Sequence, residues 1–134
     1  MSTNANKELV RRYTDEAYRR ANPAICDELL APSVDDVQGE KEFVRQVATA
    51  FGNRQYTILE LLGEGDRVAW IGQFKGTHQG EFLGVAATGS PVVVEAMAYV
   101  RIADGKIVEF RGYWDRESVR EQLTAVTATD KTAL

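Results

Sequence analysis

Few side chains in this chain have the reactivity that catalysis needs. The 134 residues include one histidine, His78, and one cysteine, Cys26, so an internal disulfide is excluded. One histidine and one cysteine cannot supply a His/Cys zinc site, and no acidic motif is clustered enough to suggest Mg²⁺. Cys26 lies in the amphipathic stretch AICDELL, where a small buried side chain is the expected role. We therefore predict no metal and no cofactor.

Three aspartates are candidate acids or bases. Asp115 stands between a predicted strand and a predicted helix, where its side chain can accept from free helix N–H groups, so we expect a helix cap. Asp35 and Asp36 lie between two predicted helices, where solvation or capping is the ordinary role. If one of them entered an apolar cavity, burial would raise its pKa toward that of a general base. We select Asp36 as the candidate base.

Composition excludes several classes of function. The net charge of −4 and the pI near 5.1 argue against nucleic acid as a partner, because phosphate binding needs a basic surface. No apolar run approaches the roughly 20 residues that cross a bilayer. The polar N-terminus lacks the apolar core of a signal peptide, so we expect a cytoplasmic protein without a membrane partner. No phosphate-binding glycine loop or G-x-S-x-G motif is present, which leaves nucleotide binding and serine-hydrolase chemistry without support.

Hydrophobic spacing predicts helices first and strands afterwards. Apolar residues recur every three or four positions over residues 6–21, 23–30 and 40–51, and the third helix is expected to stop at Gly52-Asn53. The period then shortens towards two, with candidate strands at Tyr56–Leu62, Arg67–Thr77, Val92–Ile102 and Lys106–Trp114. A short helix over Arg116–Leu123 follows. This order predicts one α+β domain over residues 1–124, with helices packed on one face of an antiparallel sheet, and a flexible tail over 125–134.

Alternation along the strands separates two faces of the sheet. The face assigned to the helices mixes small residues with large rings, namely Trp70, Gly72, Phe74, Ala96, Ala98, Phe110, Gly112 and Trp114. Such a mixture could leave a hollow lined by rings, which would suit an apolar ligand. Helix side chains could equally fill the small positions, as in an ordinary core. On the opposite face, charged residues such as Arg101 and Glu109 are expected to form cross-strand ion pairs or dimer contacts.

Several motifs resemble one family of proteins over most of the chain. G-T-H-x-G-E-F-L-G-x-x-x-T-G followed by R-I-x-D-G-K-I-V-E, together with ELLAP and a closing REQL, is similar to the SnoaL-like polyketide cyclases. This resemblance spans residues 7–123. The family belongs to the NTF2-like superfamily, together with the ketosteroid isomerases. It implies a cone, in which a strongly bent sheet wraps around three helices and encloses a ligand cavity, and a homodimer formed through the outer sheet face.

The resemblance also implies where catalytic groups belong, and this chain departs from it. The aspartate that the cyclases carry near the end of the last strand falls on Gly112. The pocket residue of the preceding strand, histidine in cyclases and aspartate in isomerases, falls on Ala98, and neither residue can move a proton. Tyr13 matches the tyrosine of the first helix that serves the isomerases as an oxyanion donor. His78 belongs to the G-T-H-x-G motif, where a structural or rim role is expected ahead of proton transfer, and it stays a catalytic candidate.

Two functions follow from these observations, and a third is weaker. The first is a cofactor-independent cyclase or isomerase that moves a proton next to the carbonyl of a polyketide-like or other cyclic apolar substrate. Tyr13, Asp36 and His78 would be its catalytic residues. The substrate would bind Trp70, Phe74, Ala98, Phe110, Gly112 and Trp114. The second is a protein that binds a small apolar or aromatic ligand without chemistry, because Ala98 and Gly112 are inert. The third is a protein–protein module, which a sealed interior would favour.

Overall fold

The computed structural model describes the backbone of residues 2–133 and the side chains of residues 2–124. Its elements follow in the order α1 (Thr3–Thr14), η1 (Asp15–Arg19), α2 (Ala24–Leu29), α3 (Val37–Ala50), β1 (Phe51–Glu64), β2 (Arg67–His78), β3 (Pro91–Ala103), β4 (Lys106–Trp114) and α4 (Arg116–Ala133). Helices precede strands, as the spacing predicts. No helix within the described residues is long and apolar enough to cross a membrane.

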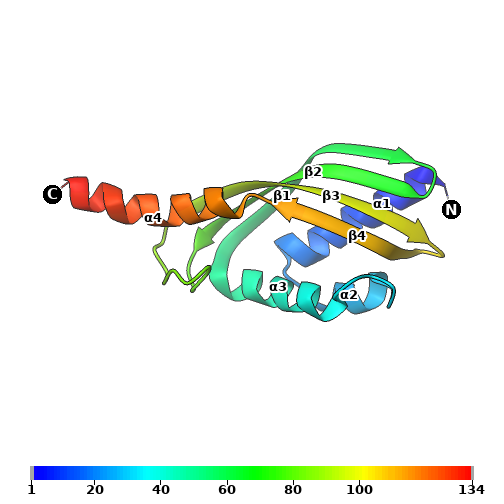
Figure 1. Ribbon diagram of the computed structural model, residues 1–134, viewed down its shortest axis with the longest axis horizontal. Coiled ribbons are helices and arrows are strands. Elements are labelled where there is room, and N and C mark those ends of the chain that lie inside the picture. Colours follow the sequence, from blue (N-terminus) through cyan, green and yellow to red (C-terminus); the bar gives the residue numbers. More distant parts are fainter. Residues whose placement is uncertain (1, 134) are drawn as a thin grey trace.

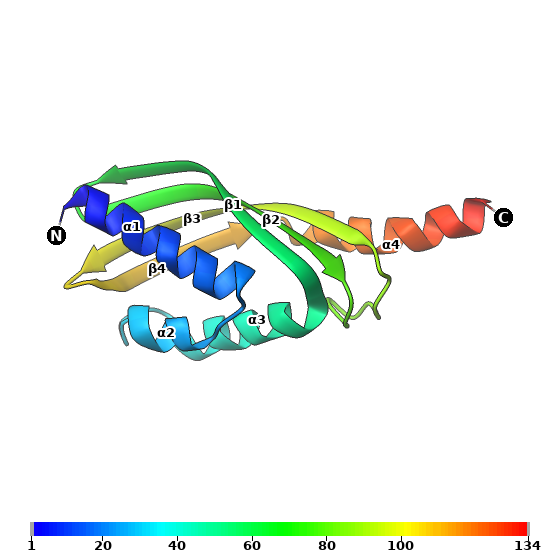
Figure 2. The same ribbon diagram turned by 180° about the vertical axis from the view of Figure 1, so that it is seen from behind.

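One antiparallel sheet organises the molecule, and its four strands pair in sequence order. The sheet is strongly curved, with α1 crossing its hollow side and α2 and α3 lying below (Figures 1 and 2). Breaks in the register of β1 after Gly52 and after Ile58 contribute to this bend, because an extra residue kinks a strand. The predicted α+β fold, a curved sheet around three N-terminal helices, is confirmed. The predicted helix stop at Gly52-Asn53 is wrong, because α3 ends at Ala50 and β1 begins with Phe51.

Large and small residues face each other across neighbouring strands on the hollow side. Trp70 pairs with Ala98, and Ala98 pairs with Gly112. In the adjacent row Ala96 lies between Gly72 and Trp114. Each row thus holds one indole and two small residues, so the rings do not cover the sheet completely.

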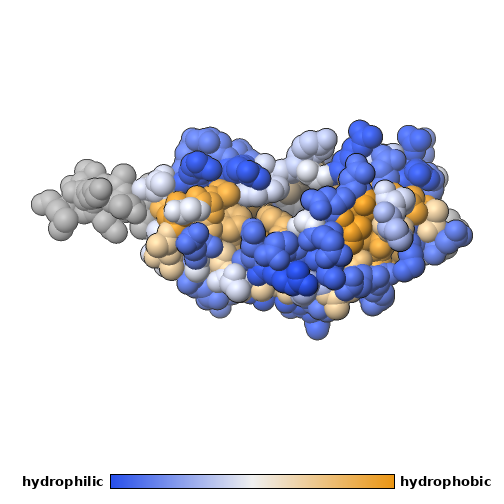
Figure 3. All heavy atoms as spheres, turned by 60° about the horizontal axis from the view of Figure 1, so that its bottom comes forward, coloured by the Kyte–Doolittle hydropathy of each residue, from blue (hydrophilic) through white to orange (hydrophobic). Residues whose placement is uncertain are grey.

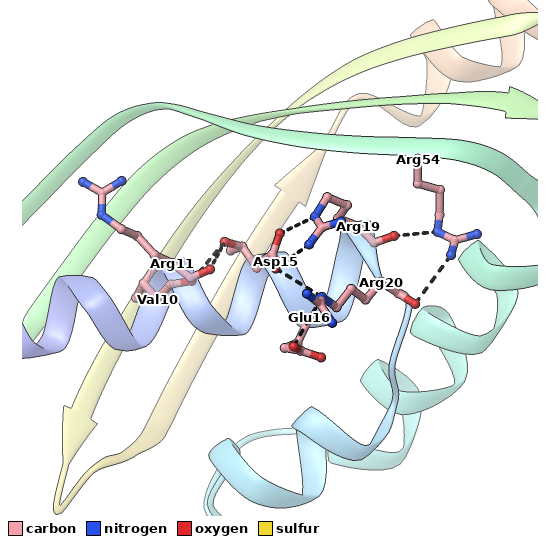
Figure 4. Close-up of polar contacts among 8 residues, drawn as sticks. Val10, Arg11, Asp15, Glu16, Arg19, Arg20 and Arg54 are labelled. Carbon is pink, nitrogen blue, oxygen red and sulfur yellow. Dashed lines mark hydrogen bonds and ion pairs between the residues drawn. The ribbon is translucent and has the colours of Figure 1, made fainter.

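A π-helical turn ends the first helix. In η1 the N–H of Arg20 donates to the carbonyl of Asp15, 3.0 Å away and five residues earlier. Arg54 of β1 holds this turn by donating to the carbonyl of Arg19 at 3.0 Å, while Asp15 is paired with Arg19 (Figure 4). Guanidinium donors thus satisfy carbonyls that the end of the helix leaves free.

Polar side chains cap the start of the last helix and bind the helix to the sheet. The carboxylate of Asp115 accepts from the N–H of Ser118 at 2.9 Å, which confirms the predicted cap. Beyond the end of β4, Gln122 exchanges two hydrogen bonds with the backbone of Val93, at 2.8 and 2.7 Å, as a neighbouring strand would. Helix α4 extends past the predicted end at Leu123. The predicted flexible tail covers residues 125–134, whose side chains lie outside the described part of the chain. Its flexibility therefore stays a prediction.

The outer face of the sheet is partly apolar. Leu62, Met97 and Tyr113 are 68%, 60% and 70% exposed. Beside them Arg101 and Glu109 form the expected cross-strand ion pair, with 3.7 Å between Nε and Oε1. A homodimer formed through this face stays a prediction.

Candidate functional site

A cavity of about 260 Å³ lies between α3 and the hollow face of the sheet. Every residue predicted to bind substrate lines it: Trp70, Phe74, Ala98, Phe110, Gly112 and Trp114. Phe43 and Val47 of α3 complete the apolar wall. On the surface of the molecule, hydrophobic side chains gather beside the first turns of α4. They extend from there toward the middle of the molecule, between hydrophilic side chains (Figure 3). The size and the aromatic lining fit a flat, small molecule.

The cavity holds one carboxyl group among the described residues, that of Glu40 in the first turn of α3. Two hydroxyls, of Tyr13 and of Tyr18, donate to the same oxygen, Oε1, each at 2.9 Å. The second oxygen, Oε2, has no hydrogen-bond partner among the described residues. Glu40 therefore keeps one oxygen with which to accept a proton or a polar group of a ligand.

The π-turn η1 allows both tyrosines to reach Glu40. Tyr13 and Tyr18 are five residues apart, and in an α-helix such positions point about 140° away from each other. A π-turn holds more residues per turn, so positions five apart approach the same side. Because η1 begins after Tyr13 and includes Tyr18, the rings of the two tyrosines meet edge to face at 6.1 Å and their hydroxyls converge on Glu40.

Burial sets the protonation of this cluster. It raises the pKa of Glu40, and the hydrogen bonds from Tyr13 and Tyr18 oppose that rise in part. Burial also raises the pKa of both tyrosines well above the ordinary value, and the charge of Glu40 adds to the effect. The tyrosines therefore stay protonated donors, while Glu40 is the group whose charge changes.

A second hydroxyl group lies on the sheet side of the cavity. Tyr56 of β1 lines the cavity, and its oxygen accepts from the indole N–H of Trp70 at 2.9 Å. The hydroxyl occupies the space above Gly72, where an added Cβ would lie 1.9 Å from the tyrosine oxygen. A glycine at position 72 thus makes room for this hydroxyl.

The structure places the predicted catalytic residues apart from one another. Tyr13 is completely buried behind Glu40 and does not line the cavity. Asp36 is exposed and caps α3, accepting from the N–H of Gly39 at 2.9 Å. Asp36 thus has the ordinary capping role and does not meet the condition for a general base, which was entry into the cavity. Glu40, one helical turn later, carries the carboxyl group there.

His78 also lies outside the cavity lining. Its ring is fully buried, and Nδ1 accepts from the backbone N–H of Thr88 at 3.2 Å. This contact ties the loop between β2 and β3 to the end of β2. The position fits the structural role that the motif predicted, and no contact joins His78 to Glu40.

Sequence reasoning missed Glu40, although a signal was present. Glu40 precedes Phe43, Val44 and Val47 by three, four and seven residues, which is the spacing of one helical face. A charged residue on an apolar stripe is a candidate buried acid. Tyr18 had no such signal, because the π-turn displaces it from the α-helical pattern of Tyr13.

Fold and site together define a class: an α+β cone around an apolar cavity that holds a partly buried carboxyl group. The model of the family described as SnoaL-like polyketide cyclase matches residues 8–123. The chain belongs to this family, as the motifs predicted.

Solved structures share the fold of this chain. TsrD from Streptomyces laurentii is 22% identical, with 93% of this chain and 98% of TsrD covered and a TM-score of 0.82. AclR from Streptomyces galilaeus, a proposed hydroxylase, is 25% identical, with 92% and 98% covered and a TM-score of 0.82. IdmH from Streptomyces antibioticus, a proposed polyketide cyclase, is 24% identical, with 89% and 98% covered and a TM-score of 0.75. No curated protein matches the chain.

Proposed function

We propose that this protein is a cofactor-independent enzyme that moves a proton next to the carbonyl of a flat, largely apolar ketone. The observation that carries the proposal is Glu40, a partly buried carboxyl group that keeps one oxygen unpaired in an aromatic cavity. Its raised pKa suits a general base, because proton transfer is most efficient when the pKa of the base approaches the working pH. Membership of the cyclase family supports carbon–carbon bond formation or isomerisation as the outcome.

The proposed step begins with the ketone between the rings of the cavity. Oε2 of Glu40 takes a proton from the carbon next to the carbonyl, and the C–H electron pair moves into an enolate. Glu40 is then a neutral acid. In an isomerisation it returns the proton to another carbon of the same molecule. In a cyclisation the enolate carbon attacks a second carbonyl, and the proton goes to the new alkoxide. Tyr13 and Tyr18 hold Oε1 throughout and so keep the carboxylate in position.

Isotope exchange tests this proposal without knowledge of the natural substrate. Flat two-ring ketones such as 2-acetylnaphthalene are incubated with the chain in D₂O, and deuterium beside the carbonyl is followed by NMR. We expect exchange with the wild-type chain and its loss in Glu40→Gln, which keeps the shape of the side chain. Asp36→Asn is the matched control and should exchange like the wild type. Equal exchange by Glu40→Gln would overturn the assignment of the base.

A second candidate function is ligand binding without chemistry. The observation that favours it is the pair Ala98 and Gly112, which face each other in the sheet and carry no acid or base. A chain that binds these ketones and exchanges no deuterium would support binding over catalysis. The third hypothesis, a protein–protein module, would be favoured by a sealed interior. The cavity therefore does not favour it.

A further inference from the structure

The hydroxyl of Tyr56 differs from those of Tyr13 and Tyr18. Tyr13 and Tyr18 both donate to Glu40. Tyr56 instead accepts from Trp70, whose indole nitrogen can only donate. The hydroxyl hydrogen of Tyr56 therefore points elsewhere, and it has no acceptor among the described residues. A donor without a partner in a cavity is a donor for a ligand.

The surrounding residues fix where this donor lies. The ring of Tyr56 packs against that of Tyr18, with 5.1 Å between centroids, and Tyr18 in turn reaches Glu40. Gly72 leaves the space that the hydroxyl fills on the inner side of β2. Trp70 orients the hydroxyl through its N–H at 2.9 Å and polarises it, since accepting one hydrogen bond strengthens the donation of the next.

We propose that Tyr56 donates a hydrogen bond to the carbonyl oxygen of the substrate and stabilises the enolate, and that Trp70 positions it. This inference rests on the proposed function. It gives Tyr56 the part that the family resemblance assigned to Tyr13, whose hydroxyl is committed to Glu40.

The arrangement narrows the class of substrate. The cavity offers an acceptor, Oε2 of Glu40, and a donor, the hydroxyl of Tyr56, and Tyr18 contacts both residues. A ketone fits both when its carbonyl and the acidic C–H lie side by side at one edge of a flat ring system. The remaining lining is apolar and suits the rings.

The infrared carbonyl stretch of bound 2-acetylnaphthalene tests the contact directly. A hydrogen bond lowers this frequency, so we expect a low value in the wild-type chain and a rise toward the value in an aprotic solvent in Tyr56→Phe. Trp70→Phe removes the orienting N–H and should raise the frequency in part. Gly72→Ala pushes the hydroxyl aside, since its Cβ would lie 1.9 Å from that oxygen, and should act like Tyr56→Phe. Tyr99→Phe, on the outer face, is the matched control and should leave the frequency unchanged.

The exchange rate adds a second readout. Removal of one oxyanion donor lowers such rates by about 10²–10³-fold, and we expect a loss of that order in Tyr56→Phe. Glu40→Gln separates the two proposals, because it should abolish exchange and keep the low carbonyl frequency. A frequency unchanged in Tyr56→Phe overturns the role of Tyr56 and leaves Glu40 in place. Failure of the wild-type chain to bind the ketone overturns both proposals.

Discussion

The two walls of the cavity differ in the chemistry they carry. The helical wall, formed by η1 and α3, holds Glu40 and the hydroxyl of Tyr18. The sheet wall holds rings and small residues, and its polar groups within the described residues are the neutral hydroxyls and indoles of tyrosine and tryptophan. One wall can accept a proton, whereas the other can orient a ring and donate a hydrogen bond. In this chain a helix, and not a strand, thus carries the carboxyl group of the cavity.

This difference is reflected in the packing behind each wall. Behind Glu40, the completely buried Tyr13 ties α1 to α3. Behind the sheet wall, the outer face is open to solvent and carries ion pairs such as Arg111 with Glu109. A carboxyl group on the helical wall is therefore backed by protein, which is why burial dominates its pKa.

The largest effect is expected from moving the carboxyl group between the walls. Glu40→Gln should lower deuterium exchange by about 10²–10⁴-fold, which is the usual contribution of a general base. Adding Gly112→Asp places an acid on the sheet wall, where its Cβ lies 3.0 Å from the ring of Phe110 and no tyrosine pair supports it. We expect no recovery of exchange in the double variant. Recovery would show that either wall can carry the base.

Removing one support of Glu40 should change the pH dependence of exchange. The hydrogen bond from Tyr18 lowers the pKa of Glu40, so Tyr18→Phe should raise that pKa. Because the base acts when ionised, the rising limb of the pH–rate profile should move to higher pH. At pH values on the rising limb, exchange should therefore fall below that of the wild type, because a smaller fraction of Glu40 is ionised. Tyr99→Phe controls for the substitution, and an unmoved limb in Tyr18→Phe would contradict the contact.

Stability should also respond to the protonation of Glu40. Its folded-state pKa is raised above 4.5, so the folded chain holds this proton more tightly than the unfolded chain. The resulting stabilisation is present below the ordinary pKa and lost as pH rises through the raised pKa. Glu40→Gln stays neutral, and its amide oxygen can still accept from both tyrosines. Relative to the wild type, its free energy of unfolding in urea should therefore increase as pH rises from 4.5 through the raised pKa of Glu40. A constant difference across that range would contradict the burial of the charge.

The smallest effect is expected from Asp36, the exposed acid one helical turn before Glu40. Asp36 caps α3 and stands outside the cavity, so Asp36→Ala should cost about 1–2 kcal/mol of stability and leave exchange per folded molecule unchanged. Asp36→Asn can still cap and tolerates the positive φ of 55°, and it should keep most of that stability. Thermal unfolding measures the stability of each variant, and the deuterium assay measures its exchange. A loss of exchange in Asp36→Asn would return Asp36 to the active site.

Alternation within single strands was the pattern in the sequence that predicted the structure best. Alternation placed the predicted lining residues on one face of the sheet, because successive side chains of a strand point to opposite faces. The family resemblance, and not alternation, then favoured a cavity over an ordinary packed core. The acid that enters the cavity lies one helical turn beyond the one that the sequence suggested. The sequence predicted a helix beginning at Glu40, whereas α3 begins at Val37, which moves Glu40 from the end of the helix onto its buried stripe. Helix ends depend on capping that tertiary packing selects, so they are the least certain feature of a sequence pattern.

By itself, the sequence determined the order of helices and strands, the inner face of the sheet and the absence of an acid at Ala98 and Gly112. These are local properties, set by hydrophobic periodicity and residue type. Only the tertiary structure decided which acid enters the cavity and which hydroxyls meet it. That cluster joins η1, α1 and α3, and Tyr56 adds β1 and β2 through Trp70. Contacts between such distant segments depend on a π-turn and on the bend of the sheet, and neither leaves a periodic signal in the chain.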